Sequence, residues 1–180
     1  YIFFERYFAI KNSSKEDPSF MERIKDYIHA GQIDYAINLC QHTDNTISRM
    51  LEQGINRIGR PLGDISAAID NLANLEIAKL EKGLPALASV AGGAPMLGFL
   101  GTVVGMIRAF YDMANAGSNI DVQLLSSGIY TAMVTTVAGL IVGIIAYFAY
   151  NALVARIERV VFRLQARAIE FMDLLNEPVN

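Results

Sequence analysis

The polar groups best placed to do chemistry are three threonines, Thr102, Thr135 and Thr136, which lie in two stretches without a charged residue. A threonine hydroxyl donates one hydrogen bond and accepts others, so along a channel lining it can face water or an ion. The same hydroxyl can bond back to the carbonyl four residues earlier in its own helix, which is its ordinary structural role. The residue types alone leave both alternatives open.

No other set of side chains points to catalysis or to a bound metal. His29 and His42 are far apart in the sequence and have no ligand-like partners, and Cys40 has neither a second cysteine nor an evident base. The glycines between residues 92 and 105 lack the lysine of a phosphate-binding loop. We therefore expect no enzymatic activity, no catalytic residue, no metal and no cofactor.

The distribution of charge indicates a membrane protein. Of 180 residues, 53% are hydrophobic and 18% are charged, against about 45–50% and 25% in soluble chains. Residues 83–107 and 122–155 contain no Asp, Glu, Lys or Arg, and about 20 apolar residues in a helix suffice to cross a bilayer. A purely soluble enzyme is thereby excluded, and a net charge of −3 gives no indication of nucleic-acid binding.

The chain is predicted to be all-α, with long transmembrane helices that extend into a cytoplasmic helical domain. Residues 1–8 read as the end of an N-terminal transmembrane helix that is mostly missing from the sequence. The other predicted segments are a cytoplasmic helical domain (9–82), a transmembrane helix (83–108), a periplasmic loop (109–123), a second transmembrane helix (124–155) and a cytoplasmic C-terminal helix (156–180).

Capping residues and breakers predict the helices around these spans. Asp17-Pro18-Ser19 begins a first helix, with Ser19 and Glu22 as its capping box, and Gly31 ends it. Further helices are expected from Ile33 to Leu39, after Asp44 to about Arg60, and from about Asp64 into the first span, because no good stop precedes Gly83. After Ala155 the pattern turns amphipathic, so one helix from about Ser126 to Asn176, roughly 75 Å long, is predicted.

The basic residues predict the orientation. Lys79 and Lys82 precede the first span and four arginines follow the second, whereas residues 111–123 between the spans contain no basic residue. Loops rich in Lys and Arg stay in the cytoplasm. The basic segment before the first span and the basic segment after the second are therefore expected to lie in the cytoplasm, and the connecting loop faces outward.

Small residues recur along both spans, which predicts close packing against other helices. Lipid provides no hydrophobic drive for helices to associate, so association depends on the close approach that small residues allow. Pro95 in mid-span removes a backbone hydrogen bond, and a kink is expected there. The two stripes are Ala88, Ala91, Pro95, Gly98, Thr102, Gly105 and Ala109, and Gly128, Ala132, Thr135, Gly139, Gly143 and Ala146.

Two segments of these spans resemble a known family. The first, residues 84–106, contains a proline followed by Leu-Gly-Phe-Leu-Gly-Thr-Val-Val-Gly at 97–105. The second contains Gly128-Ile129, Ala132-Met133, Thr135-Thr136, Gly139-Leu140 and Tyr150-Asn151. They resemble the two signatures of the MotA/TolQ/ExbB channel proteins, most closely ExbB, and with the flanking helices the resemblance covers nearly the whole chain.

The resemblance implies a multi-pass protein of the bacterial inner membrane that forms a homopentamer with a central pore. A dimer of an ExbD-like single-span protein would sit in the pore and carry the acid that protons pass. Proton flow would drive a TonB-like protein that reaches outer-membrane transporters. The residues predicted by this resemblance and by the small-residue stripes are Thr102, Thr136 and Thr135 for the ion pathway, and Pro95, Gly98, Gly101, Gly105 and Gly139 for helix packing and kinking.

The chain departs from the family pattern at two places. Thr131 stands where many ExbB and TolQ chains have a glutamate, and residues 143–145 lack a proline that is usual near the inner end of the last span. Neither span contains a carboxylate, so a titrating group in mid-membrane has to come from another protein. The resemblance thus implies that the partner's acid, and not this chain, binds the proton in mid-membrane.

Other readings remain open from the sequence. A TolQ-like or MotA-like subunit would have the same channel and a different load. A membrane scaffold that oligomerises through the small-residue stripes would conduct nothing. Arg156, Arg159 and Arg163, just inside the membrane, could contact anionic lipid headgroups or pair with acidic residues.

Overall fold

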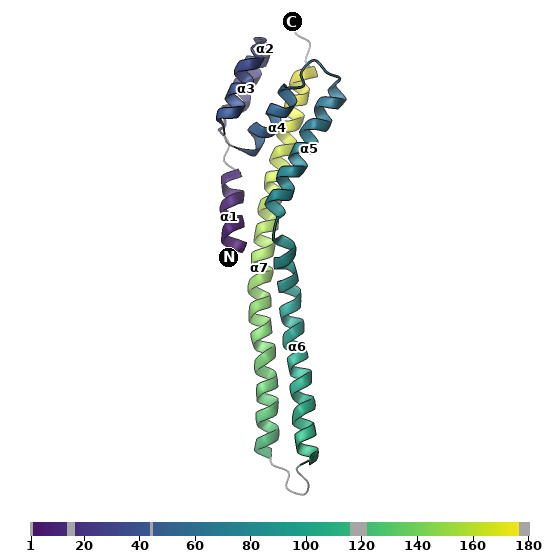
Figure 1. Ribbon diagram of the computed structural model, residues 1–180. Coiled ribbons are helices and arrows are strands. Elements are labelled where there is room, and N and C mark those ends of the chain that lie inside the picture. Colours follow the sequence, from purple (N-terminus) through teal and green to yellow (C-terminus); the bar gives the residue numbers. More distant parts are fainter. Residues whose placement is uncertain (1, 14–16, 44, 116–121, 177–180) are drawn as a thin grey trace. The chain divides into compact units, whose positions relative to one another are not determined.

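The structure of this chain is built from α-helices. The computed structural model describes residues 2–13, 17–43, 45–115 and 122–176, and within these ranges it contains seven helices and no strand. This agrees with the all-α fold predicted from the sequence. Figure 1 labels these helices in the order of the chain.

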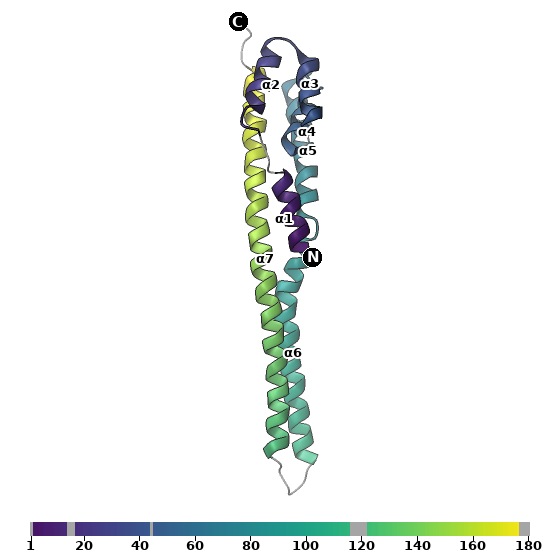
Figure 2. The same ribbon diagram turned by 90° about the vertical axis from the view of Figure 1, so that its left-hand side faces the viewer.

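The chain divides into two compact units. One unit contains residues 1–82 together with residues 153–180, and the other contains residues 83–152. Figures 1 and 2 show α1 to α5 in the first unit and α6 in the second, while α7 contributes to both. Each unit is described by itself.

The first unit begins with three short helices, α1 (Ile2–Ser13), α2 (Phe20–His29) and α3 (Ile33–His42). The turn after α2 contains Gly31 at a φ of +68°, a left-handed conformation that glycine adopts without strain. Gly31 thus ends the helix as predicted. The Ser19–Glu22 capping box is wrong, because the Ser19 side chain makes no cap bond; instead the Asp17 carboxylate accepts hydrogen bonds from the backbone N–H and the hydroxyl of Ser19.

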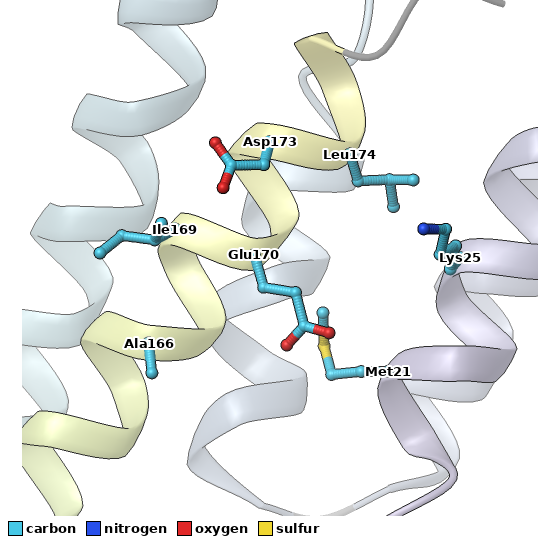
Figure 3. A pocket seen from close by; sticks show the side chains of 7 residues that line it. All are labelled: Met21, Lys25, Ala166, Ile169, Glu170, Asp173 and Leu174. Carbon is cyan, nitrogen blue, oxygen red and sulfur yellow. The ribbon is translucent and has the colours of Figure 1, made fainter.

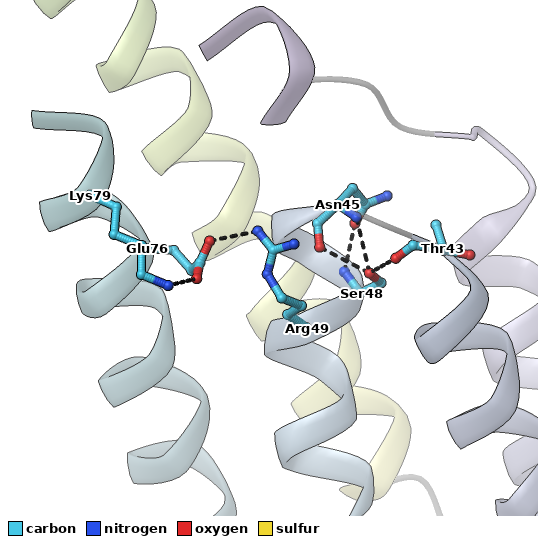
Figure 4. Close-up of polar contacts among 6 residues, drawn as sticks. All are labelled: Thr43, Asn45, Ser48, Arg49, Glu76 and Lys79. Atoms are coloured by element: carbon cyan, nitrogen blue, oxygen red, sulfur yellow. Dashed lines mark hydrogen bonds and ion pairs between the residues drawn. The ribbon is translucent and has the colours of Figure 1, made fainter. Parts of the chain in front are cut away.

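The helix α4 (Thr46–Ile55) begins at a capping box that the sequence pattern did not reveal. The side chain of Asn45 accepts a 2.7 Å hydrogen bond from the N–H of Ser48, and the Ser48 hydroxyl lies 3.4 Å from the N–H of Asn45 (Figure 4). The helix ends five residues before the predicted Arg60, and turns follow it up to Pro61. Ser48 escaped notice because capping boxes are normally sought as Glu or Gln at this position.

The sequence predicted one helix from about Asp64 into the first span, and this prediction was wrong. The helix α5 (Leu62–Glu81) ends before α6 (Leu84–Asn115) begins. Lys82 is extended, with ψ at +125°, and Gly83 has a φ of +86°, so two residues interrupt the helix. Pro85 then lies in the first turn of α6, where its missing N–H removes no helical hydrogen bond. Gly83 is therefore a helix stop.

The helices α6 and α7 (Val122–Asn176) are long and apolar enough to cross a membrane. The length of α7 confirms the single helix expected from Ser126 to Asn176. Many of their large apolar side chains are exposed in the chain by itself, including Met96, Phe99 and Ile145, which are 73%, 66% and 65% exposed. Such surfaces require lipid or other protein chains around them.

The first unit has its own apolar core. The helices α2 to α5 pack in sequence, each on the next, and the C-terminal half of α7 adds a stripe with the predicted three- and four-residue spacing. Gly54 of α4 allows close contact, because a Cβ atom there would lie 2.8 Å from both Ile69 and Phe171. The largest fully buried core side chains include Phe20, Ile24, Met50, Leu51, Ile55, Ile65, Ile69, Leu153, Leu164 and Phe171.

A buried carboxylate joins α4 to α5 in this unit. Glu76 is buried, and its two oxygens accept hydrogen bonds from Arg49, at 2.7 Å, and Lys79, at 2.6 Å (Figure 4). Burial alone would raise the pKa of Glu76, but the hydrogen bonds from Lys79 and Arg49 outweigh it and hold the pKa below its ordinary value of 4.5. The carboxylate is therefore charged at neutral pH.

This lowered pKa predicts a loss of stability in acid. The ionised Glu76 carboxylate contributes its full stabilisation above the ordinary pKa of 4.5. This contribution disappears as the pH falls through the lower pKa of the folded state. We expect Glu76→Gln to cost about 1.5 kcal/mol at pH 7, because the hydrogen bonds from Arg49 and Lys79 lose their charged acceptor, and less at low pH. Thermal unfolding of both proteins between pH 7 and 3 measures this. A constant difference across that range would contradict the pairing.

Candidate functional site

The second unit is a pair of antiparallel helices, α6 and α7, which lie side by side in both views (Figures 1 and 2). At its centre the two backbones touch. A Cβ atom added to Gly98 would lie 2.9 Å from the carbonyl oxygen of Thr135, and one added to Gly139 would lie 2.6 Å from the carbonyl oxygen of Ala94. Only glycine fits at either position with this helix spacing.

The same close contact continues towards both ends of the pair. Towards the start of α6, Gly143 faces Pro95, whose ring carbon Cγ would be 2.4 Å from an added Cβ atom. Towards the loop, Gly105 faces Ala132, whose Cβ atom would lie 2.7 Å from a Cβ atom added to Gly105. The small residues predicted for helix packing therefore lie between α6 and α7 of one chain. Gly143 was part of the predicted stripe, but its role as the space for the proline ring was missed.

The three predicted threonines come together at the middle of this contact. The hydroxyl of Thr102 donates to the carbonyl of Ala132 at 2.9 Å, and the hydroxyl of Thr136 donates to the carbonyl of Gly98 at 3.1 Å. Thr135 donates to Ala132 at 2.7 Å, and the hydroxyls of Thr102 and Thr136 are in direct contact. Two of these bonds cross from one helix to the other, so the cluster also fastens the pair.

Gly101 is part of this cluster. A Cβ atom at Gly101 would lie 2.6 Å from the Thr135 hydroxyl oxygen, so the glycine leaves room for that group. Each threonine hydroxyl has one proton, which the backbone carbonyls can accept, and its oxygen keeps lone pairs for another donor. In this arrangement the threonine cluster can accept a hydrogen bond from a protonated acid or a hydrated proton. To receive a carboxylate, one hydroxyl must turn away from its carbonyl.

The predicted lipid-contact arginines lie in the first unit, on the part of α7 that follows Ala152. Arg156, Arg159 and Arg163 line a pocket of about 240 Å³ together with Ile10 and Lys11 of α1. The guanidinium of Arg156 also lies 4.2 Å from the centre of the Tyr7 ring. Lys11 and Tyr7 were missed in the sequence, because nothing there indicates that α1 lies beside α7.

A second pocket in the first unit contains both charged and apolar side chains. It has a volume of about 290 Å³, and Figure 3 shows the carboxylates of Glu170 and Asp173 on α7 and the amine of Lys25 on α2 around it. Arg167 pairs with Glu170 at 2.5 Å. The charges nearly balance, so this pocket resembles an ordinary solvated groove more than a ligand site.

The groups that could support other chemistry are poorly placed for it. Burial raises the pKa of the Cys40 thiol to about 12, with a further contribution from Glu52, so the thiol stays protonated and a poor nucleophile. Among the described residues there is no group of three His, Cys, Asp or Glu side chains that could hold a metal ion. The threonine cluster is thus the polar site at the centre of the contact between the two apolar helices.

Comparison with known proteins relates this chain to a family of proton channels. The sequence model of the MotA/TolQ/ExbB proton channel family matches residues 42–166. The Tol-Pal system protein TolQ of Pseudomonas aeruginosa is 28% identical, over 98% of this chain and 81% of its own length. The biopolymer transport protein ExbB of Aquifex aeolicus is 36% identical, over 56% of this chain and 68% of its own length.

A third relative is an ExbB homolog of Methanothermobacter thermautotrophicus, 27% identical over 82% of this chain. The chain spans about half of that relative, 52% of its length. The family match includes α6, most of α7 and every threonine of the cluster. This chain therefore belongs to the MotA/TolQ/ExbB proton channel family.

Proposed function

We propose that this chain forms the wall of a proton channel in the bacterial inner membrane, with a partner protein supplying the acid. The observation that carries the proposal is the convergence of Thr102, Thr135 and Thr136 on two backbone carbonyls between helices that contain no charged residue at that depth. A titrating group in mid-membrane must come from outside this chain. A single-span, ExbD-like partner with an intramembrane aspartate would provide it.

The proposed mechanism uses the two states of that aspartate. When it is protonated, it is neutral and can pass an apolar wall such as Met106, Val134 and Val137 at low cost. When it is charged, it is stabilised only opposite Thr102 and Thr136, after a hydroxyl turns to donate to it. Each proton taken up or released would therefore change which position along the wall the partner prefers.

The proposed assembly is a homopentamer around a dimer of the partner, whose proton flow works on a TonB-like protein to drive outer-membrane transport. Exposed apolar side chains on α6 and α7 support an assembly of several chains, because they need other surfaces around them. Two partner helices cannot face five threonine clusters equally. Successive proton steps could then rotate the partner relative to the wall.

A TolQ-like function in envelope constriction is the second candidate. It is favoured by the Pseudomonas aeruginosa TolQ relative, which matches 98% of this chain and 81% of its own length. Expression of this chain with each kind of partner, in a host that lacks both systems, distinguishes the two. Restored growth on chelated iron would indicate the ExbB-like load, and restored resistance to detergent the TolQ-like load.

We further propose that Arg156, Arg159 and Arg163 contact lipid headgroups. Basic residues near an anionic membrane surface contribute about 1 kcal/mol each. With Lys11 they surround one pocket, whose size and charge suit a phosphate group. In this proposal, the lipid contact holds α1 and α7 at the inner membrane surface and takes no part in proton transfer.

The main experiment is reconstitution of the chain with its single-span partner in proteoliposomes. We expect an imposed pH gradient to produce proton uptake that a dye inside the vesicles records, and an Asp→Asn change in the partner helix to abolish it. Particle images of the same complex give its subunit count. An intact complex that passes no protons would contradict the proposal and favour a non-conducting scaffold.

A further inference from the structure

A second polar site lies between α6 and α7, towards the end of the pair that is predicted to face outward. It is a pocket of about 280 Å³. Arg108 and Asp112 line it from α6, one helical turn apart, and Ser127 and Thr131 line it from α7 with the same spacing. Two charges on one helix thus share a pocket with two hydroxyls on the other.

The composition of this pocket is unusual for the unit that contains it. Between Lys82 and Arg156 the chain has only three charged residues, Arg108, Asp112 and Asp121. Two of these three line the pocket, and Asp121 lies outside the described residues. Both side chains are exposed at the end of the pair that is predicted to face outward, where a cation from the outer water would meet them first.

The pocket lies next to the threonine cluster along the contact of α6 and α7. Gly105 lines the pocket, and a Cβ atom there would lie 2.7 Å from Ala132. The carbonyl of Ala132 in turn accepts the hydrogen bonds of Thr102 and Thr135. One turn of α7 therefore separates the pocket from the cluster, and the two polar sites follow one another along the same helix contact.

The oxygen atoms of the pocket suit a small cation. The hydroxyl of Thr131 donates to the carbonyl of Ser127 at 2.9 Å, which leaves its oxygen lone pairs available to a cation. The Asp112 carboxylate attracts a cation, and the guanidinium of Arg108 on the next turn limits how tightly it is held. A conducting site requires this balance, because an ion must both bind and leave.

We propose that this pocket is the outer mouth of the ion pathway, where Asp112 collects the transported cation, a proton or a sodium ion, before it reaches the threonine cluster. The proposal rests on the proposed channel function. Asp112 raises the local cation concentration, Ser127 and Thr131 contribute oxygen atoms, and Arg108 speeds release. For a sodium ion no bond forms or breaks. For a proton the step is a reversible transfer: the carboxylate accepts the proton from a hydronium ion of the outer water, an O–H bond forms, and the proton then returns to a water molecule nearer the threonine cluster.

The test compares Asp112→Asn with the unchanged chain, each in the reconstituted complex with its partner. We expect proton flux to fall about tenfold at neutral outer pH, in line with the loss of electrostatic focusing, and to recover in part as the outer side is acidified. Asp112→Glu should retain the flux. Tyr111→Phe is the matched control, since Tyr111 precedes Asp112, is exposed and does not line the pocket.

A second variant keeps the test decisive if Asp112→Asn fails to assemble with the partner. Arg108→Gln should hold the cation longer, so that flux saturates at a higher outer pH than in the unchanged chain. If the original complex conducts and the variants show the same flux with the same pH dependence, the role of this pocket is overturned. The channel function would then remain intact. Absence of flux from the unchanged complex would instead overturn the channel function, and this inference with it.

Discussion

Replacement of both Thr102 and Thr136 with valine is expected to reduce proton flux by about tenfold or more. Valine has nearly the same shape but cannot hydrogen-bond, and a hydrogen bond to a charged group contributes about 1.5–3 kcal/mol. In the proposed mechanism, the partner's carboxylate loses its one favourable position along the wall. A loss of that size corresponds to a tenfold or greater change in rate.

The measurement is dye-detected proton uptake by proteoliposomes that contain the double variant and its partner. The helix pair should survive, because hydrogen bonds between membrane helices contribute only about 0.6 kcal/mol each on average. Co-purification of the partner therefore serves as the control for assembly. Unchanged flux from an assembled complex would remove the threonine cluster from the mechanism.

Replacement of Gly139 with valine is expected to separate α6 from α7. The added Cβ atom would lie 2.6 Å from the carbonyl oxygen of Ala94 and 2.9 Å from Cα of Gly98. Both are backbone atoms that cannot turn aside, so the cost should reach the upper end of the 1–3 kcal/mol typical of overpacking, about 3 kcal/mol. We expect a lower unfolding temperature in detergent and loss of the complex.

Gly92→Ala provides the matched control on the same helix pair. Gly92 lies within α6, and nothing is within 4 Å of a Cβ atom added there. Alanine should therefore be neutral or stabilising by up to about 1 kcal/mol, as at other open helical positions. If Gly139→Val unfolded at the same temperature as Gly92→Ala, the close backbone contact at Gly98 and Gly139 would be refuted.

The sequence predicted the elements of this fold better than their contacts. Apolar stretches and helix signals predicted the two long helices and the turn at Gly31, because these depend on local composition and backbone conformation. The continuous helix across Gly83 was wrong, although glycine followed by Pro85 is a local stop signal. Continuity was expected because no stop signal precedes Gly83, whereas the helix is interrupted at Lys82 and Gly83 themselves.

For the site, the spacing of small residues predicted which faces pack, but not which residues meet. That Gly143 leaves space for Pro95, and that Lys11 lies with the arginines of α7, are contacts between segments distant in the sequence. Such contacts depend on the register of one helix against another, which no single segment determines. The threonines were identified by their resemblance to a family signature and not by their chemistry alone.

The contact of bare backbone at Gly98 and Gly139 has a consequence for motion. The atoms nearest to Gly98 and Gly139 across the contact belong to backbone, which has no rotamer to change and cannot let one helix slide along the other. A working cycle in this protein must therefore keep the spacing of α6 and α7 fixed while the threonine hydroxyls turn. Larger displacements that perform work have to occur at surfaces the helix pair shares with other chains.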